Sequence, residues 1–308
     1  MMQEAVSRHS GAGAQVSSLG AAHEAHERNR LIGVMNRYLD ALTARDVRKV
    51  PLGASVRCTE NGCELALGAG LWRTIRGRRP RTQCFVDVSA GQVEAWGIAD
   101  EMGKELIFGV RLRVEGRLIS EIETAVVRVG PSDVNPVDLD VFDRSPDSIH
   151  EVLPPQDRVS REQLVRVANL YFDAIEQSDG SHLPVSDGCT RYVNGIIDSV
   201  MDQTDLDKLD KNQAHRGHKV AAQMSAGDYA YIEHLRGRRY PIVDEFRGLV
   251  LAHVMFDHPG DLTRASGENP MPSPNCLLAF EVFKVRKGVL TDVWAIGPIL
   301  PYGMKTGW

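Results

Sequence analysis

Residues 38–62 read YLDALTARDVRKVPLGASVRCTENG, and residues 171–195 read YFDAIEQSDGSHLPVSDGCTRYVNG. The two stretches align without a gap at an offset of 133 residues, and seven of the 25 positions are identical. The shared residues are Tyr, Asp, Ala, Asp, Pro, Asn and Gly, in that order. Self-similarity at a fixed offset is the signature of an internal repeat. The sequence therefore predicts two related units in one chain.

A helix is expected at the start of each unit. Apolar residues fall on one stripe of a 3.6-residue period, which is typical of an amphipathic helix. Ser160 and Gln163 have the spacing of a capping box before the second helix. Pro51 and Pro184 follow the two helices and should end them. The stripe residues are Leu31, Val34, Met35, Tyr38, Ala41 and Leu42 in the first unit, and Leu164, Val167, Ala168, Tyr171, Ala174 and Ile175 in the second.

A region rich in strands follows each helix. Residues 91–101 match residues 248–258, and both halves carry the tetrapeptide Arg-Gly-Arg-Arg, at 76–79 and 236–239. The offset between the halves has grown to 160 at this tetrapeptide, so roughly 27 residues entered the second half within 196–232. Insertions usually fall in loops, and loops on a rigid scaffold often carry function. We therefore expect the second half to hold the functional site and the first to serve as a scaffold.

The chain divides into four parts on this interpretation. Residues 1–28 are rich in Gly, Ala and Ser and are expected to be a disordered leader. Residues 29–130 and 161–308 are expected to be two α+β domains. Residues 131–160 are rich in proline and acidic residues, which indicates a linker.

Composition excludes several classes of protein. The chain has 308 residues, 43% of them apolar and 25% charged, with a net charge of −5. This is ordinary for a globular protein and argues against a nucleic-acid partner. The sequence has no apolar run of 18 residues, which argues against a membrane span, and no secretory signal. Five cysteines, an odd number, indicate reduced thiols in a cytoplasmic protein.

The pattern as a whole resembles the nuclear-transport-factor-2-like superfamily. The resemblance rests on the helix end Y-x-D-A-x-x-x-x-D, the proline and short strand after it, and the run of long strands, and it covers about 31–129 and 161–300. This superfamily includes ketosteroid isomerase, scytalone dehydratase and polyketide cyclases of the SnoaL type. The resemblance implies two tandem cone-shaped α+β units, each a curved antiparallel sheet with N-terminal helices and a pocket. It also implies packing of the two cones as a pseudo-dimer, with a homo-oligomer as a further option.

Several chemical motifs are missing from the sequence. It has no glycine-rich nucleotide loop, no nucleophile elbow and no zinc-type spacing of ligands. His215 and His218 form a lone His-x-x-His within the insertion. We therefore predict chemistry without a cofactor or a bound metal, which leaves proton transfer as the reaction type.

Four residues of the second half are candidates for acid/base catalysis. His253 stands in the middle of the apolar strand LVLAHVMFD, where a neutral imidazole could act as a base. Tyr171 lies on the apolar stripe of its helix and could polarise a substrate oxygen. His182 and Asp187 replace Lys49 and Ala54 of the first half. Each of the four could instead be structural: a core histidine, a core tyrosine or residues of a surface loop.

A second group of residues is expected to bind the substrate. An arginine of the repeated tetrapeptide, Arg239, could hold an anionic group, although repetition in both halves favours a structural role. The other members of the group are Asp257, His258, Trp294 and Tyr38.

Two main hypotheses follow. The first is a cofactor-independent lyase or isomerase that acts on a hydrophobic small molecule, expected to be aromatic, in the second-domain pocket. The second is a non-catalytic binding or assembly module of the same fold. A weaker third option is epoxide or ester hydrolysis. Convergence of the candidate residues in one cavity would favour an enzyme, and their dispersal would favour a binding module.

Overall fold

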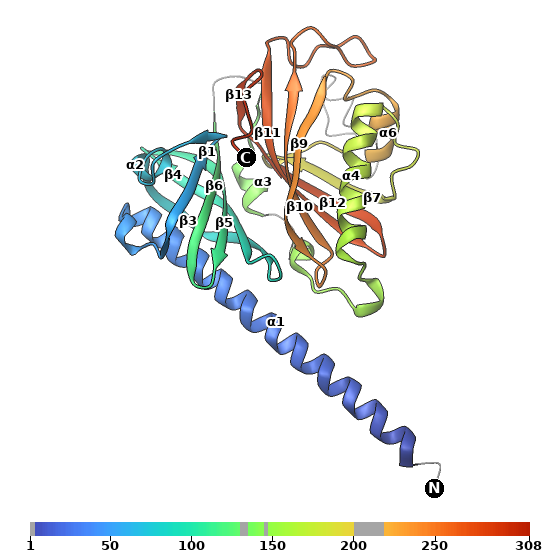
Figure 1. The fold of residues 1–308 in the computed structure, drawn as a ribbon. Helices are drawn as coiled ribbons and strands as arrows, with labels where there is room; N and C mark the ends of the chain where they lie inside the picture. Colours follow the sequence, from blue (N-terminus) through green and yellow to red (C-terminus); the bar gives the residue numbers. More distant parts are fainter. Residues whose placement is uncertain (1–3, 130–134, 145–146, 200–218) are drawn as a thin grey trace.

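The protein contains two mixed β-sheets with helices, arranged as two similar α+β units (Figure 1). The computed structural model describes residues 4–129, 135–144, 147–199 and 219–308. The first unit consists of α1 (Glu4–Ala44), η1 (Val47–Lys49), β1 (Leu52–Glu60), β2 (Cys63–Glu64), α2 (Leu71–Thr74), β3 (Ile75–Asp87), β4 (Gln92–Glu101), β5 (Lys104–Glu115) and β6 (Leu118–Arg128).

The second unit repeats this order of elements. Short helices precede it in the connection: α3 (Leu139–Asp143), η2 (Asp147–His150) and η3 (Pro155–Asp157). The unit itself consists of α4 (Arg161–Gln177), β7 (Val185–Val193), β8 (Ile196–Ile197), α6 (Val220–Ser225), β9 (His234–Asp244), β10 (Leu249–His258), β11 (Asn275–Arg286), β12 (Val289–Ile296) and β13 (Ile299–Pro301).

The two sheets have the same topology. Their strand orders are β2-β1-β6-β5-β4-β3 and β8-β7-β12-β11-β10-β9, and β13 adds to β11 in the second sheet. Each sheet contains one parallel pair, β1 with β6 and β7 with β12, and its other pairs are antiparallel. The predicted α+β class and tandem repeat are thus confirmed, with mixed sheets in place of purely antiparallel ones.

The repeated Asn-Gly pair forms the same hairpin turn in both units. Asn61 and Gly62 have φ of 50° and 76°, and Asn194 and Gly195 have φ of 52° and 83°. Two consecutive residues with positive φ are what a type I′ turn needs, and Asn-Gly adopts it at low cost. The Asn61 amide also accepts from the backbone N–H of Val126 at 2.7 Å. The Asn194 amide accepts from the equivalent Gly297 N–H at 2.9 Å.

In each unit, the repeated aspartate of the first helix forms an ion pair with the repeated Arg-Gly-Arg-Arg tetrapeptide. The helix aspartates Asp40 and Asp173 receive ion pairs from the third residue of each tetrapeptide, Arg78 at 3.0 Å and Arg238 at 2.6 Å. Arg238 also pairs with Glu176. Each ion pair joins the first helix of a unit to the outermost long strand of its sheet. The tetrapeptides therefore recur because they fasten helix to sheet, which supports their structural interpretation.

Each sheet is covered on one face by its own helices and on the other by the opposite sheet. The first cluster of buried apolar residues joins α1 to the first sheet, and the second joins α4 and α6 to the second sheet. A third cluster combines residues of both sheets, including Phe85 and Trp96 from the first and Met255 and Phe280 from the second. The two units thus pack sheet against sheet, as the pseudo-dimer hypothesis expects.

The amino-terminal segment differs from expectation. Residues 1–28 were expected to be disordered, but α1 begins at Glu4 and runs without a break to Ala44. Its first part projects away from both sheets (Figure 1). Glu24 and Arg28 form an ion pair at i,i+4 spacing, and Arg28 also reaches Asp244 of β9 at 2.8 Å. These contacts extend the helix beyond the stripe of apolar residues that predicted it.

A buried lysine holds the connection between the units against the second sheet. Lys284 of β11 is 3% exposed and donates to the carbonyl oxygens of Ile149, Glu151 and Arg247 at 3.3, 3.0 and 2.7 Å. We expect Lys284→Met to lower the free energy of unfolding by about 2–4 kcal/mol, because it leaves three carbonyl groups without a charged donor. Urea denaturation measures this change.

The neighbouring exposed cation provides the control. Arg286 is half-exposed and pairs with Glu151 at 2.8 Å. Arg286→Gln should cost less than about 1 kcal/mol, as exposed ion pairs usually do. Equal small losses for the two variants would contradict the role given to Lys284.

Candidate functional site

His253 faces the first unit and not the interior of the second cone. Residues at alternate positions of a strand point to opposite faces of the sheet. On β10, Val250, Ala252 and Val254 pack under α4, whereas Leu251 and Met255 belong to the cluster between the sheets. His253 shares the second face and stacks on Phe280 with ring centroids 3.6 Å apart. The sequence predicted an apolar strand around His253 but not what this face of the strand contacts.

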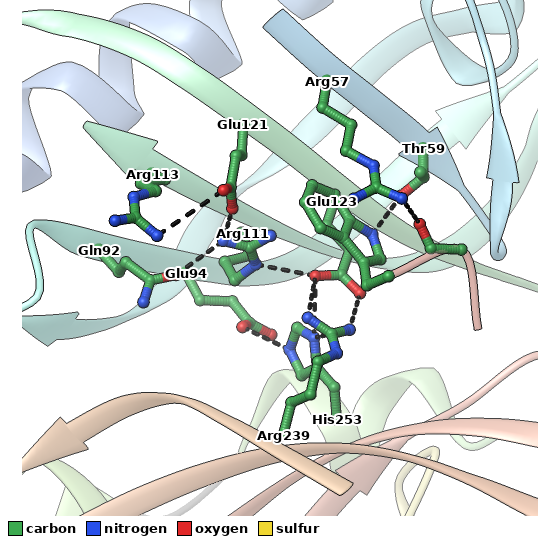
Figure 2. A network of polar contacts seen from close by, with 12 residues as sticks. Arg57, Thr59, Gln92, Glu94, Arg111, Arg113, Glu121, Glu123, Arg239 and His253 are labelled. Atoms are coloured by element: carbon green, nitrogen blue, oxygen red, sulfur yellow. Dashed lines mark hydrogen bonds and ion pairs between the residues drawn. The ribbon is translucent and has the colours of Figure 1, made fainter. Parts of the chain in front are cut away.

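Buried charges from both units surround His253 (Figure 2). Its Nε2 lies 2.9 Å from Oε2 of Glu94, and its Nδ1 lies 3.2 Å from Oε2 of Glu123. Glu123 also receives Arg111 Nε at 2.8 Å and is paired with Arg239. Residues His253, Glu94, Glu123, Arg111 and Arg239 are called the interface cluster below.

Charge compensation explains how the interface cluster stays buried. Burial by itself would raise the pKa of Glu123, but His253, Arg239 and Arg111 outweigh it and lower that pKa. The side chain of Trp308 covers the cluster, with its ring 4.6 Å from the Arg111 guanidinium and 5.6 Å from that of Arg239. The contacts of Glu123 with His253 and Arg239, and the contact of Trp308 with Arg111, join the second unit to the first. The interface cluster is therefore explained as an inter-unit lock, and Arg239 belongs to it.

Removal of the Glu123 carboxylate should weaken the packing of the two units. Glu123→Gln removes the buried carboxylate that Arg111, Arg239 and His253 share, and breaking a buried ion pair typically costs about 3–5 kcal/mol of unfolding free energy. Because the folded-state pKa of Glu123 is lowered, its stabilisation is present above the usual carboxyl pKa of about 4.5 and is lost at lower pH. The difference in unfolding free energy between wild type and Glu123→Gln should therefore shrink by about 1.4 kcal/mol for each pH unit below about 4.5.

Urea denaturation at neutral and acidic pH tests this prediction. Glu121→Gln is the matched control, since Glu121 contacts Arg111 at 2.8 Å but is more exposed. A cost for Glu123→Gln no larger than that for Glu121→Gln would show that the interface cluster does not hold the units together.

The remaining residues predicted from the sequence do not gather in one place. His182 and Asp187 are exposed, and Asp187 pairs with Lys219 at 3.2 Å. Trp294 lies between the sheets and stacks on Tyr192 at 4.2 Å. His182, in the turn before β7, and Asp187, within β7, are both exposed, whereas Tyr171 is fully buried. The predicted catalytic set is therefore corrected: its members lie on two faces of the sheet and on the surface.

Two other predicted residues lie at one end of β10. Asp257 receives Arg236 at 2.6 Å and the Cys276 thiol at 2.9 Å, so its carboxylate is already occupied. His258 is buried against Asn275, with Nδ1 2.9 Å from the amide oxygen. Burial lowers the pKa of His258. His215 and His218, the lone His-x-x-His, lie outside the described residues.

The interior of the second cone contains a different polar group around Tyr171. The Tyr171 hydroxyl lies 3.5 Å from Oε1 of Glu281 and both side chains are fully buried. Arg191 of β7 contacts Tyr229 and Asp198. The Tyr229 hydroxyl lies 3.0 Å from both Asp198 Oδ2 and Gln223 Oε1. Residues Tyr171, Arg191, Asp198, Gln223, Tyr229 and Glu281 are called the cone cluster below.

Glu281 is the most perturbed acid of the cone cluster. Burial raises its pKa to about 7, against the opposing effects of Arg191 and of the Tyr171 hydrogen bond. Its Oε2 and the Nε of Arg191 have no hydrogen-bond partner among the described residues. Burial likewise raises the pKa of Tyr171, which keeps the phenol neutral. The cluster thus holds a carboxyl group that is ready to exchange a proton near neutral pH.

The first cone has no such cluster at the equivalent positions. Val110 stands where the second cone has Glu281, and Cys58 stands where it has Arg191. Tyr38, the counterpart of Tyr171, accepts a hydrogen bond from Trp72 Nε1 at 3.1 Å, and the two rings pack edge to face. Tyr38 is therefore a core residue whose hydroxyl is satisfied within the unit.

Sequence reasoning missed every member of the cone cluster except Tyr171. Glu281 is a lone acid in the apolar strand CLLAFEVFKV, and Gln223 and Tyr229 lie in the insertion that was expected to carry function. A position-by-position comparison of the two halves would have shown Glu281 opposite Val110. The sequence therefore contained the information, as a charged residue in the second half opposite an apolar residue in the first, and not as a recognisable motif.

Known proteins were compared with the chain as a whole. A family model described as a domain of unknown function (DUF8021) matches residues 24–126 and 157–297. The chain belongs to this family. The two matched segments of the DUF8021 family correspond to the two structural units. No curated protein shows a significant match.

Several solved structures resemble part of this DUF8021 chain. AusH from Aspergillus nidulans is 13% identical, with a TM-score of 0.28, and covers 45% of this chain and 85% of that chain. A candidate polyketide cyclase from Silicibacter sp. TM1040 is 17% identical, with a TM-score of 0.30, and covers 45% and 91%. BvnE pinacolase from Penicillium brevicompactum is 16% identical, with a TM-score of 0.27, and covers 44% and 86%.

Two structural features of the DUF8021 protein concern metals and membranes. Among the described residues, no group of three or more His, Cys, Asp or Glu side chains is arranged to hold a metal ion. None of the described helices combines the length and the apolar character needed to span a membrane.

The raised pKa of Glu281 predicts how the stability of this DUF8021 protein depends on pH. The folded state keeps a proton up to about pH 7, whereas the unfolded state loses it near 4.5. Stability should therefore fall as the pH rises through this window, by about 3 kcal/mol in total. Glu281→Gln removes the titrating group. The free energy of unfolding of the variant, relative to that of wild type, should therefore rise by about 2–3 kcal/mol from pH 5 to pH 8.

Urea denaturation across this pH range measures the difference. Glu268→Gln, which removes a half-exposed carboxylate of the same unit, is the control. A constant difference between Glu281→Gln and wild type would show that Glu281 titrates at an ordinary carboxyl pKa.

Proposed function

We propose that the second unit is a cofactor-independent lyase or isomerase that moves a proton on a hydrophobic, aromatic small molecule. Glu281 is its general base. The observation that carries the proposal is the buried Glu281 carboxyl, whose Oε2 has no partner among the described residues. Burying such a group without a partner is costly. Strongly perturbed groups of this kind are concentrated at functional sites.

The surroundings of Glu281 suit proton abstraction from carbon. A general base works best when its pKa is near the working pH, and that of Glu281 is about 7. Apolar side chains surround the carboxyl, including Ala252, Ala279 and Phe283. They would keep water away from a bound aromatic molecule.

Tyr171 is the hydrogen-bond donor in the proposed reaction. Its neutral hydroxyl faces Glu281 Oε1 at 3.5 Å. Once Glu281 takes up a proton, the Tyr171 hydroxyl is free to donate to the oxygen on which negative charge develops. Arg191 lies on the same side of the sheet and adds positive charge there, while its contacts with Tyr229 and Asp198 fix its position.

The first unit is proposed to be a scaffold. Val110 and Cys58 cannot form the carboxyl–guanidinium arrangement, and Trp72 already satisfies Tyr38. On this proposal the domains comprise residues 29–130 and 161–308, joined by a linker, and the DUF8021 family is a tandem branch of the nuclear-transport-factor-2-like superfamily. A cytoplasmic location is part of the proposal and is supported by five free cysteines.

A general probe of carbon-acid chemistry tests the proposed base. In 5-nitrobenzisoxazole a base removes the ring C–H proton, the N–O bond breaks, and a coloured cyanonitrophenolate forms. Wild type should accelerate this reaction with a rate that rises through about pH 7, since the ionised form of Glu281 is required. Glu281→Gln should lower the rate by about 10²–10⁴-fold with the fold intact.

Asp187→Asn is the matched control, because it removes an exposed carboxylate of the same unit. It should leave the rate unchanged. Equal rates for wild type and Glu281→Gln would contradict the catalytic assignment. Retained binding of the probe without turnover in wild type would favour the alternative, a non-catalytic small-molecule-binding or assembly module.

A further inference from the structure

A groove separates α1 from the second unit, and it shares no lining residue with the cone cluster. It has a volume of about 650 Å³, within the usual range for small-molecule sites. Three of the residues that line it are arginines: Arg28 of α1, Arg158 just before α4, and Arg247 in the turn between β9 and β10. We propose that this groove binds an organic anion, a carboxylate or phosphate ester attached to an apolar body.

The charges in the groove do not balance. Within the described part of the chain, two carboxylates meet the three guanidinium groups: Glu24, which pairs with Arg28 at 2.7 Å, and Asp244. Asp244 is shared between Arg28 at 2.8 Å and Arg247 at 3.5 Å. Arg158 pairs with no carboxylate among the described residues. The groove therefore has a net positive charge that a bound anion would neutralise.

Arg158 has the geometry of a ligand-binding arginine. Its Nε donates to the carbonyl oxygen of Leu153 at 2.8 Å, and its guanidinium lies over the ring of Phe246 at 4.7 Å. These two contacts fix the plane of the guanidinium. Its two terminal nitrogens have no partner among the described residues, so they can form the two parallel hydrogen bonds that carboxylates and phosphates accept.

Crowding of positive charge is also visible at Arg247. Burial and then the charge of Arg28 lower the pKa of Arg247, although Asp244 and Glu24 oppose them. A bound anion would reverse this effect. Arg247 is already held by the carbonyl oxygen of His150 at 3.1 Å, so the ligand would meet a preformed site.

Apolar surfaces beside the arginines accommodate the body of the ligand. Val152, Pro155 and Phe246 line the groove on the side of the second unit, and Ala25 lines it on α1. An apolar wall that ends in guanidinium groups fits a molecule with one anionic head. A free inorganic ion would leave this wall unused.

Calorimetric titration of the full chain with three probes tests the proposal. They are 2-naphthoate, 2-naphthyl phosphate and the neutral 2-naphthamide. At least one anion should bind about tenfold or more tightly than the amide, since a charged hydrogen bond is worth about 1.5–3 kcal/mol. Added salt should weaken the anions selectively. The comparison of the two anions identifies the head group.

Variants then place the binding in the groove. Arg158→Gln should weaken anion binding about tenfold or more. Asn29→Asp, a change at an exposed residue of the groove, should weaken it by adding negative charge. Arg117→Gln in the exposed β5–β6 turn is the matched control and should have no effect.

Glu281→Gln separates this site from the proposed reaction. Anion binding should be unchanged in that variant if the groove is the site. Binding that is lost in Glu281→Gln but kept in Arg158→Gln would overturn the proposal and place the anion in the cone. Equal affinity of wild type for the anions and the amide would overturn it as well.

Discussion

Strand β10 is buried along its whole length, and the rest of the structure depends on this constraint. All ten residues from Leu249 to His258 are buried. A strand of this kind must be covered on both faces. One face packs under α4 and the other packs on the sheet of the first unit. Its side chains therefore point alternately into two separate interiors, and this separation decides which polar residues can act together.

The interior between the sheets is used for assembly. Glu94 and Glu123 of the first unit meet His253 and Arg239 of the second, so each unit supplies partners for buried groups of the other. Breaking one such contact leaves a buried charge without a partner, which costs more than the contact itself contributes. The chain end adds to the lock, because Trp308 donates to Thr59 of β1 at 2.9 Å. The interface cluster and Trp308 therefore join the two units in the same region.

The repeat allowed much of the fold to be predicted from the sequence. Helix stripes, the Asn-Gly turns and the doubled tetrapeptide depend on local geometry, and each recurs with the same structural role. The location of the site depends on which interior each strand face meets, and periodicity carries no information on that. His253 was chosen because it is a histidine in an apolar strand. That feature fits an inter-unit lock as well as it fits a catalytic base, and the structure shows the lock.

The identity of residues that differ between the halves gives a better guide to function than the identity of those that recur. The repeated Asp, Pro, Asn and Gly residues have structural roles in both units. At equivalent positions facing the cone interior, the first unit has Val110 and Cys58, whereas the second has Glu281 and Arg191. An apolar pair would cost nothing to bury at this place, as the first cone shows, whereas a carboxyl group with an unpartnered oxygen is destabilising there. A fold that carries such a charge in one unit and does without it in the other does not need it for stability, and this difference supports the chemistry proposed for Glu281.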